Sequence, residues 1–553
     1  MTERPPSIYY HCVKPTYSRR PLIHAATLVL LLACACPSLF SADKKIAKPP
    51  ADSVQAINQT TMKEHLEFLA SDQLGGRYTL SPSFQIAAQY LATRLKAYGY
   101  KGAGDNGGYF QGFEVLTLKP DGDKMSASIT VNGQKTDLSY GDFYNAGSKG
   151  GSLSGGIVFV GYGVSAPRLN HDDYANIDAK GKWVITVRGT PKGVDASALK
   201  DDEQGNDAAR AHGAIGLLSL PPAQFLAAMK ANAEMFKKRS LSQESVRLAY
   251  NNEGRLPALT AGPALLDKVL PLTGETLETI AAKVKDHSDF TSKDLGAELT
   301  ANIGLVSTPI KTQNVVGILE GTDPQLKSEY VIFSAHYDHL KTSPTGEIYH
   351  GADDDGSGTT TVLNIAQAMS MHRPKRSVFI IFHAGEELGL LGSQYNSDHP
   401  AVPLDKTVVD LNIDMVGRSK PAGDTAEADK QLTDANTIYV IGANRISKEL
   451  NEISEATNNE FEKLKFDYTL NDPNHPDRIY FRSDHWNYAK HGVPIIFYFD
   501  GVHVDYHKPT DTVDKIDFDK MTKVGRLVYE TGWHLANMDH MLKKDVETTA
   551  AAK

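Results

Sequence analysis

Four continuous runs of apolar residues in the second half of the chain constrain its fold more than any other feature. They occupy residues 315–319, 330–333, 378–382 and 495–498. A strand with one face in water alternates apolar and polar residues, whereas a strand buried on both faces is apolar throughout. Helical patterns at 359–371, 445–456 and 521–541 can cover the two faces of such a sheet. The sequence therefore predicts an α/β fold in which helices sandwich a buried sheet.

The pattern changes along the chain, and the length of 553 residues exceeds that of one ordinary domain. Residues 43–60 are polar and contain Lys, Ala and Pro, which predicts a flexible lead-in. Residues 140–270 have short apolar strands between Gly- and Asp-rich turns, with one predicted helix over 222–238. Because this middle segment has no cluster of metal-ligating side chains, we predict a small separate domain there.

Charge and cysteine content exclude several classes of function. The net charge is −9 with acidic and basic residues interspersed, so we expect no nucleic-acid partner. The three cysteines are Cys12, Cys34 and Cys36, all within the first 36 residues. The rest of the chain therefore has no disulfide or cysteine–metal scaffold, and any metal must be held by His, Asp and Glu.

Residues 1–42 have the features of an export signal. Two arginines precede an apolar run over residues 22–33, and small residues follow it. The run suits a signal peptide and is short for a membrane span. We predict a periplasmic or secreted protein without an integral membrane domain in its mature chain; an uncleaved anchor and a mistaken upstream start are the alternatives. Residues 31–34 also resemble a lipoprotein cleavage box, so a lipid anchor at Cys34 is a further alternative.

Five short segments rich in His, Asp and Glu each lie where a predicted strand ends. They are residues 334–338, 351–358, 381–389, 411–418 and 504–512. Open α/β sheets bind their ligands at the carboxyl ends of the strands. We therefore expect the five segments to meet at one edge of the sheet.

The first two segments offer an imidazole and a choice of carboxylates. His336 and Asp338 share a face of a strand, and a metal-bound imidazole commonly donates its second N–H to a carboxylate. Asp353, Asp354 and Asp355 lie between glycines, which predicts a tight loop that presents one carboxylate. Spacing alone does not select which of the three it is. The alternatives are a histidine paired with a neighbouring aspartate and an exposed acidic turn before a helix.

The other three segments add three carboxylates and an imidazole. Glu386 and Glu387 follow a buried strand, and adjacent side chains diverge, so that one can bind a metal while the other reaches the metal's water. Asp414 lies in an apolar strand and needs a cation, because an unpaired buried carboxylate is costly. A metal and Arg418 are the two candidates for that cation. His507 lies in the loop after the last strand, where an ordinary surface histidine is the alternative.

Together the segments supply two imidazoles and three carboxylates, with a spare glutamate beside a ligand. Such a set can bind a pair of divalent metals about 3.5–4 Å apart with one bridging carboxylate. Nitrogen and oxygen ligands with open positions favour zinc, with cobalt or manganese as substitutes. The sequence therefore predicts two zinc ions per chain.

In order and spacing, from residue 311 to 517, the five segments resemble those of zinc-dependent exopeptidases related to bacterial leucyl aminopeptidases and glutamate carboxypeptidase II. The resemblance implies a mixed, mostly parallel sheet sandwiched by helices. The metal ligands that it implies are His336, Asp354, Glu387, Asp414 and His507. In that scheme Asp354 bridges the ions, Glu386 is the general base and Asp338 orients His336. The nearby histidines that match no ligand of the family, and are predicted to line or support the site, are His339, His350 and His383.

The middle of the chain resembles a protease-associated domain. Residues 180–189, 208–216 and 256–259 carry this likeness. It implies a mainly-β domain over 140–295, without catalytic residues, inserted into the peptidase. The catalytic domain is then formed by 43–135 and 300–545, and a flexible tail over 546–553 follows it.

The resulting functional prediction is a metallopeptidase that removes N-terminal residues from peptide substrates. An aminopeptidase binds the free ammonium group with its own catalytic carboxylates, and no basic cluster dedicated to a substrate carboxylate is evident, although Arg418 and Arg482 lie near the segments. A carboxypeptidase of the same fold is one alternative. A catalytically dead binding or receptor-like protein is another, opposed by the complete ligand set. A glutaminyl cyclase of the same fold is opposed by His336.

Overall fold

A computed structural model of the chain describes residues 46–146, 149–196, 199–252, 254–472 and 475–546. The described residues belong to one compact unit that begins at Ile46. The predicted export signal lies outside the described residues, as does almost all of the predicted tail. Within the described ranges no helix is both long enough and apolar enough to cross a membrane.

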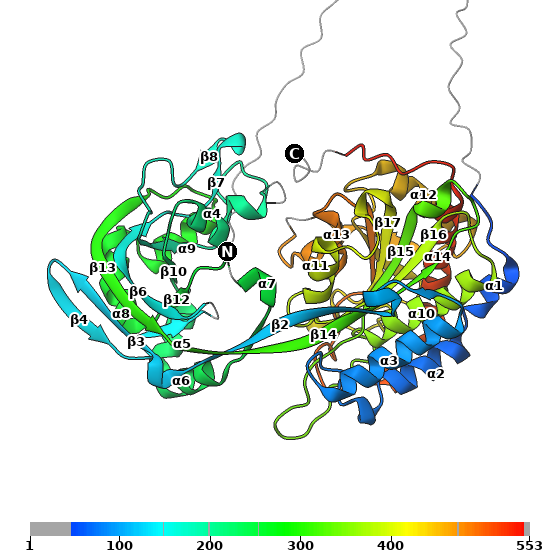
Figure 1. Cartoon of the computed structure of the whole chain (residues 1–553), viewed down its shortest axis with the longest axis horizontal. Helices are drawn as coiled ribbons and strands as arrows, with labels where there is room; N and C mark the ends of the chain where they lie inside the picture. The colour runs from blue at the N-terminus through cyan, green and yellow to red at the C-terminus, as the bar shows by residue number, and fades with distance from the viewer. Residues whose placement is uncertain (1–45, 147–148, 197–198, 253, 473–474, 547–553) are drawn as a thin grey trace, which may run out of the picture. The chain divides into compact units, whose positions relative to one another are not determined.

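A mixed sheet of ten strands is the larger of the two main sheets (Figure 1). Its strands are β1 (Lys101–Gly102), β2 (Phe110–Pro120), β11 (Ser245–Leu248), β14 (Leu305–Leu319), β15 (Tyr330–His336), β16 (Ser377–His383), β17 (Thr407–Ile413), β18 (Thr437–Ile441), β19 (Lys465–Asp467) and β20 (Ile495–Phe499). The order is β11-β2-β14-β16-β15-β17-β20-β18-β19, with β1 paired to β14. The central strands β16, β15, β17 and β20 are parallel. The four predicted apolar runs lie in β14, β15, β16 and β20, which confirms the α/β prediction.

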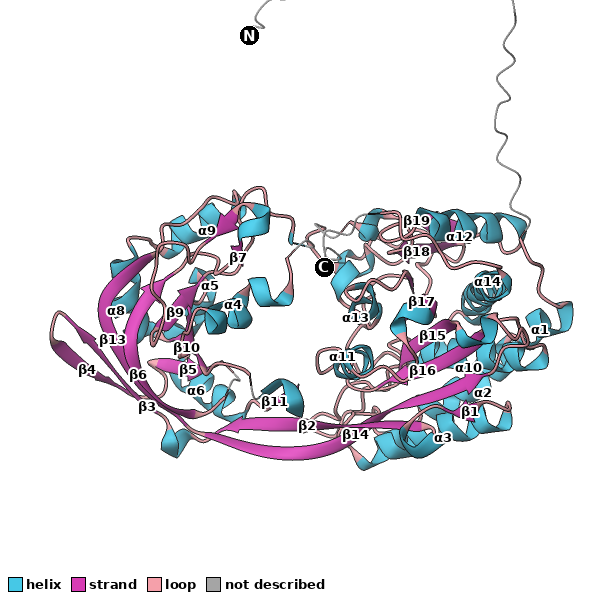
Figure 2. Cartoon of the chain, turned by 45° about the horizontal axis from the view of Figure 1, so that its top comes forward, coloured by secondary structure: helices cyan, strands magenta, loops and turns pink. Residues whose placement is uncertain are grey.

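Helices cover both faces of this sheet, as Figure 2 also shows. They are α1 (Ala51–Ala56), α2 (Gln59–Leu69), α3 (Pro82–Ala97), α10 (Gly356–Met371), α11 (Leu391–Asp398), α12 (Lys448–Glu460), α13 (His485–Ala489) and α14 (Phe518–Asn537). In β15, Val331 and Phe333 join the hydrophobic core under α2, α3, α10, α12 and α14. Ile332, between them, joins the core on the opposite face with Tyr488 of α13. This alternation explains why the strand sequences are apolar throughout.

Two local predictions differ from the structure. The expected flexible lead-in is helical over α1, because Ser53 is fully buried where α1 packs on α10 and α14. The single helix expected over 222–238 is two helices, α5 (Ala223–Ala231) and α6 (Ala233–Ser242). The break is at Asn232, whose backbone is not helical (φ −137°, ψ 46°). Asparagine has a weak helix propensity, so the interruption costs little there.

A second, eight-stranded sheet draws on the middle of the chain. Its order is β4-β3-β13-β6-β9-β10-β12-β5. The strands are β3 (Ser126–Val131), β4 (Gln134–Leu138), β5 (Phe143–Asn145), β6 (Gly151–Phe159), β9 (Trp183–Thr186), β10 (Gly216–Ser219), β12 (Ala258–Ala261) and β13 (Lys293–Ile303). The remaining elements are β7 (Ser165–Ala166), β8 (His171–Asp172), α4 (Gly205–Ala211), α7 (Ala249–Asn252), α8 (Pro263–Thr273) and α9 (Leu277–Lys285). This sheet has a hydrophobic core of its own, in which Trp183 is fully buried.

Two long antiparallel strands carry the chain into and out of this second sheet. β2 and β14 pair from Phe110 opposite Val315 to Pro120 opposite Leu305, and they lie side by side in Figure 2. The middle segment also returns one strand to the larger sheet, because β11 pairs with β2. The division into a catalytic domain and an insertion at 140–295 stays a prediction.

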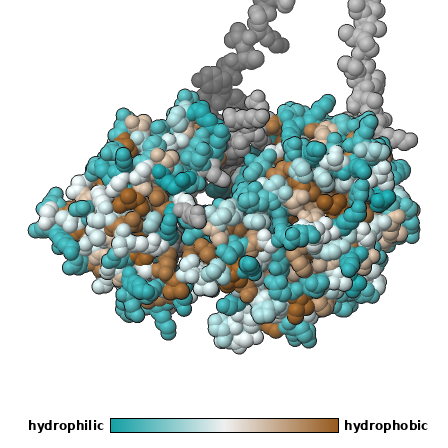
Figure 3. Space-filling view, viewed as in Figure 1, coloured by the Kyte–Doolittle hydropathy of each residue, from teal (hydrophilic) through white to brown (hydrophobic). Residues whose placement is uncertain are grey.

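The surface is mixed in character, in keeping with the interspersed charges. On the face shown in Figure 3, hydrophilic and neutral residues predominate and hydrophobic ones occur in small groups. The large hydrophobic side chains that are exposed among the described residues are Ile86, Phe225, Met235, Tyr250, Val306, Met371 and Val504.

Candidate metal centre

The predicted site residues come from five different elements that end at one edge of the larger sheet. His336 is the last residue of β15, Glu386 and Glu387 follow β16, and Asp414 follows β17. His507 lies in the loop after β20, and Asp354 lies in the loop before α10. β15, β16, β17 and β20 are parallel neighbours, so their carboxyl ends lie at the same edge. The strand order therefore brings together segments that are far apart in the sequence.

The carboxylate of Asp354 lies at the middle of this cluster. Its Oδ1 is 3.3 Å from Nε2 of His336, and its Oδ2 is 3.1 Å from Nε2 of His507. Nε2 of His507 is also 3.1 Å from Oε2 of Glu387. On the other side, Nε2 of His336 is 3.5 Å from Oδ1 of Asp414. Each of the five predicted ligands thus contacts at least one other, and the two oxygens of Asp354 face two separate imidazoles.

The structure selects Asp354 from the three adjacent aspartates. Oδ1 of Asp353 accepts the backbone N–H of Gly417 at 2.7 Å. Oδ1 of Asp355 accepts the backbone N–H groups of Gly358, at 2.8 Å, and Met415. Both flanking carboxylates therefore accept backbone N–H groups, and the second oxygen of Asp353 lies 3.2 Å from Nε2 of His503. Asp354 is the one that faces the imidazoles of His336 and His507.

Two groups of side chains have the geometry to hold a metal ion. One is His336, Glu386 and Asp414; the other is His339, Asp354 and Glu387, and in each group the ligand atoms lie within 4.8 Å of one another. Several atoms of these groups are buried without a hydrogen-bond partner, among them Nε2 of His336, Oδ2 of Asp354 and Oε1 of Glu387, and so is Nε2 of the adjoining His507. Buried polar atoms without partners are costly unless an ion satisfies them. The arrangement fits the predicted pair of zinc ions, and in this sense the cofactor prediction is confirmed.

His339 belongs to the site, although the sequence analysis placed it among lining or structural residues. Its side chain is fully buried, with Nδ1 2.8 Å from Oε1 of Glu387 and 3.7 Å from Oδ2 of Asp354. The only sequence signal was its position three residues after His336. The other two histidines lie outside the two groups: Nε2 of His350 bonds Asp72, and Nε2 of His383 bonds the hydroxyl of Tyr488.

Asp338 contacts the site through both its backbone oxygen and its carboxylate. Nδ1 of His336 lies 3.1 Å from the backbone oxygen of Asp338 and 3.7 Å from its carboxylate. The carboxylate instead accepts the hydroxyl of Thr79 at 2.8 Å and the backbone N–H of Glu386 at 3.1 Å. Asp338 thus holds the backbone of Glu386, while both its backbone oxygen and its carboxylate face the imidazole of His336. That it orients His336 stays a prediction.

Arg418, the rival partner for Asp414, is engaged elsewhere. Its guanidinium lies 2.8 Å from the carboxylate of Asp505 and 3.6 Å from that of Asp511. Asp414 instead faces His336. The partner of the buried Asp414 carboxylate is therefore the imidazole of His336 or a metal ion, and not Arg418.

The electrostatics of the cluster favour bound cations. Burial opposes a positive charge on His336, but the carboxylates of Asp414 and Glu386 outweigh it and hold the pKa of His336 well above its ordinary value. Burial likewise lowers the pKa of His507, but the carboxylates of Asp354 and Glu387, each 3.1 Å from its Nε2, raise it to about 10. Burial raises the pKa of Glu386 well above its ordinary value. Without metal, protons take the place of the cations that these carboxylates attract.

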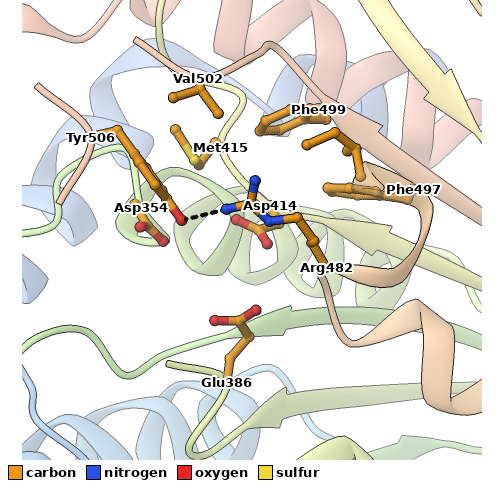
Figure 4. Close-up of a pocket in the computed structure, with 10 residues that line it drawn as sticks. Asp354, Glu386, Asp414, Met415, Arg482, Phe497, Phe499, Val502 and Tyr506 are labelled. Atoms are coloured by element: carbon orange, nitrogen blue, oxygen red, sulfur yellow. Dashed lines mark hydrogen bonds between the residues drawn. The ribbon is translucent and has the colours of Figure 1, made fainter. Parts of the chain in front are cut away.

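An apolar pocket adjoins the metal centre (Figure 4). Its apolar lining residues are Met415, Ile479, Phe497, Phe499 and Val502. Asp354, Glu386 and Asp414 line it on the metal side. Arg482 and Tyr506 complete the lining, and the guanidinium of Arg482 donates to the Tyr506 hydroxyl at 3.3 Å, the dashed line in Figure 4.

The fold and the site together define a metal-dependent α/β protein with two adjoining ligand groups. Residues 314–532 match the model of peptidase family M28. A protein of Arthroderma otae named "Probable leucine aminopeptidase" is 30% identical over 301 residues, which are 48% of this chain and 76% of that protein. The chain belongs to peptidase family M28.

Two further likenesses bear on the fold and on the extent of the match. Aminopeptidase YwaD of Bacillus subtilis is 27% identical over 290 residues, 51% of this chain and 55% of that protein. The matched segment thus spans about half the length of this relative. The solved structure of an aminopeptidase from Aneurinibacillus sp. strain AM-1 has a TM-score of 0.51 at 17% identity, over 89% of this chain and 97% of that one. This last likeness shows a shared fold.

Proposed function

We propose that the protein is a two-zinc aminopeptidase that hydrolyses the first peptide bond of peptides with a free N-terminus. The observation that supports this most directly is the convergence of His336, Asp414, Glu387 and His507 around Asp354, with Glu386 beside them. In this proposal Asp354 would bind both ions, His336 and Asp414 would hold one of them, and Glu387 and His507 would hold the other. His339 is a further candidate for the second site.

Glu386 is the proposed general base. It lines the pocket, and its Oε2 is 3.9 Å from Nε2 of His336. Zinc ions bound here would supply Lewis-acid activation of a water molecule and positive charge for the developing oxyanion. Glu386 takes the proton of the attacking water and returns it to the nitrogen of the leaving amine as the carbon–nitrogen bond breaks. The backbone N–H that Glu386 donates to Asp338 keeps the side chain at this place.

The pocket supports an aminopeptidase with a preference for apolar N-terminal residues. Carboxylates on its metal side can bind the free ammonium group, while its wall, lined by Phe497, Phe499 and Val502 among others, can bury a side chain such as that of leucine or phenylalanine. Burial of such a side chain contributes about 1.5–3 kcal/mol. A charged side chain would lose its hydration in the same place.

One residue favours a carboxypeptidase as the second candidate. Arg482 is a cation that lines the pocket, and no carboxylate among the described residues lies within 4.0 Å of its guanidinium. It could therefore bind the carboxylate of a substrate's C-terminal residue.

Aminoacyl anilides with free and with acetylated N-termini distinguish the two candidates. We expect the free leucyl and phenylalanyl anilides to be cleaved faster than the acetylated ones, and cleavage to stop with a chelator and return with zinc. The aspartyl anilide should be a poor substrate. Faster cleavage of the acetylated compounds, or of peptides that are blocked only at the N-terminus, would end the aminopeptidase proposal in favour of the carboxypeptidase.

We further propose that residues 140–295 form an inserted protease-associated domain and that the protein is exported, to the periplasm or the medium. The separate hydrophobic core around the second sheet supports the first proposal. The arginines and the apolar run before residue 42 support the second. Mass spectrometry of the protein recovered from its producing cells tests export: a mature chain that begins near residue 43 is expected, a lipid-modified Cys34 would show a lipoprotein, and an intact N-terminus would contradict cleavage.

A further inference from the structure

Arg77 is a fully buried arginine directly behind the metal centre. Its side chain is 1% exposed, and it lies in the segment between α2 and α3, far from the five metal-binding segments in the sequence. Among the described residues no carboxylate is within 4.0 Å of its guanidinium, in contrast to the buried Arg376, which pairs with Glu329. An arginine buried without an ion pair calls for a reason, since a buried charge is costly.

All the hydrogen bonds of this guanidinium go to backbone oxygens. Nε donates to Tyr337 at 3.1 Å, Nη1 to Leu69 at 2.7 Å and to His350 at 2.6 Å, and Nη2 to Gly351 at 2.8 Å. Four of the five N–H groups of the side chain are thus used. A lysine ammonium has three donors on one point and cannot reach four such separated carbonyls.

Three of the four carbonyls belong to the two segments that carry His336 and Asp354, and the fourth, that of Leu69, ends α2. Tyr337 directly follows His336, while His350 and Gly351 begin the loop that presents Asp354. The backbone oxygen of Arg77 also accepts the N–H of His339. One rigid, planar group therefore sets the distance between the segment of the first imidazole and the loop of the central carboxylate.

The same loop is held from its other side by an anion. The carboxylate of Asp511 accepts the backbone N–H groups of Asp353, at 3.0 Å, and Asp354, at 3.2 Å. Carbonyl groups of the loop thus accept hydrogen bonds from the buried Arg77, and its N–H groups donate hydrogen bonds to the buried Asp511. Burial lowers the pKa of Arg77 below its ordinary value, and the carboxylates of Asp354, Asp355 and Asp511 offset part of this effect. A guanidinium keeps its charge in proteins, so Arg77 is a cation beside the acidic cluster.

We propose that Arg77 is a positioning residue of the metal centre, which sets its zinc affinity by fixing the Asp354 loop against the His336 segment and by partly neutralising the carboxylates there. This inference rests on the proposed two-zinc site. Loss of groups that orient metal ligands typically costs 10- to 100-fold in metal affinity. We expect an effect of that size from Arg77, without any contact between its side chain and the metal or the substrate.

The test measures zinc affinity by competition with a chromophoric chelator, together with zinc per chain and the melting temperature of the metal-free protein. R77M should weaken zinc binding by about 10- to 100-fold. R77K keeps the charge but loses the planar set of guanidinium donors, and it should weaken zinc binding by a smaller factor. R376M is the matched control: Arg376 is as deeply buried and donates to Leu535, Met538 and His540 carbonyls, but at the opposite end of β16. It should lower the melting temperature and leave zinc affinity unchanged.

Chemical rescue separates a positioning role from general destabilisation. Arg77 has φ 56°, a conformation that glycine adopts readily, so R77G removes the side chain without straining the backbone. Guanidinium at non-denaturing concentration should restore most of the zinc affinity of R77G, whereas urea, of similar planar shape but uncharged, should not.

The outcomes distinguish this inference from the proposed function. If wild type binds two zinc ions and both R77M and R77K bind them as tightly, the inference is wrong, whatever happens to the melting temperature. Equal losses of affinity in R77K and R376M would also overturn it. If wild type itself fails to bind two zinc ions, the proposed function fails first. Should R77M not fold, R77K and the rescue of R77G decide the matter.

Discussion

At the scale of single residues, the contacts of each side chain indicate its part in the site. Asp354 faces two imidazoles because Asp353 and Asp355 are occupied with backbone N–H groups. Glu387 contacts two imidazoles, those of His339 and His507, whereas Glu386 lies by the pocket, 3.9 Å from His336. The proposed mechanism assigns metal binding to Glu387 and proton transfer to Glu386, although Glu386 also lies in the group with His336 and Asp414 that could hold an ion.

If Glu386 is the base and Glu387 a ligand, a change of Glu386 should lower the turnover without lowering the zinc content. E386Q removes the group that takes a proton but keeps the size of the side chain, so turnover should fall by about 10²- to 10⁴-fold or more. Zinc per chain, measured by elemental analysis, should stay at the wild-type value. If the zinc content of E386Q fell together with its turnover, Glu386 would be a metal ligand and not the base.

Two histidines compete for the second site, and a matched pair of variants ranks them. Nε2 of His507 is 3.1 Å from both Asp354 and Glu387, whereas Nδ1 of His339 is 2.8 Å from Glu387 but 3.7 Å from Asp354. H507A should therefore lower zinc occupancy from about two to about one per chain, and H339A should lower it less. The reverse order in the measured zinc content would make His339 the ligand and His507 its support.

At the scale of elements, the helices around the sheet carry charges whose burial affects stability. α14 packs on α10 and contributes Glu530, which is 2% exposed and has an oxygen without a hydrogen-bond partner. Burial, helped by Glu462, raises the pKa of Glu530 to about 8 from an ordinary value of 4.5. The helix thus tolerates this residue best when it is protonated.

The raised pKa of Glu530 predicts how stability depends on pH. Between pH 4.5 and about 8 the folded chain retains a proton that the unfolded chain has lost, so the contribution to stability is full below this window and is lost as pH rises through it. The free energy of unfolding of E530Q relative to wild type should rise by up to about 1.4 kcal/mol per pH unit. Urea unfolding at about pH 5.5, 7 and 8.5 measures this, and a difference that does not change with pH would contradict it.

At the scale of the whole molecule, the metal centre joins segments from residue 336 to residue 507, and Arg77 adds the N-terminal helices to it. Because the ligands converge only in the folded chain, zinc should bind the folded state and not the unfolded one. Metal binding is then also a source of stability for the larger sheet.

Zinc removal should accordingly lower the melting temperature. A ligand present at about 1,000 times its dissociation constant stabilises the folded state by about 4 kcal/mol per site. We expect the melting temperature of the metal-free protein to rise with added zinc and to level off after about two equivalents, and E386Q to show the same rise. A melting temperature that does not respond to zinc would mean that the carboxylate cluster is satisfied without metal.

The sequence by itself determined the α/β class, the four buried strands, the five ligand-bearing segments and the preference for zinc. These follow from local properties: a strand buried on both faces must be apolar along its length, and a chain body without cysteine must bind metal through imidazole and carboxylate groups. The flexible lead-in and the uninterrupted helix over 222–238 were wrong, because burial of Ser53 and the backbone of Asn232 depend on neighbours that the sequence pattern does not show.

Only the tertiary structure decided which carboxylate of 353–355 faces the imidazoles, that His339 joins them, and that Asp338 holds the backbone of Glu386. Only the structure, too, brought Arg77 behind the metal-binding loop. Each of these depends on the direction in which a loop side chain points once strands distant in sequence have aligned. Spacing along the chain carries no information about that direction, because it is set by the hydrogen bonds that the folded neighbours offer.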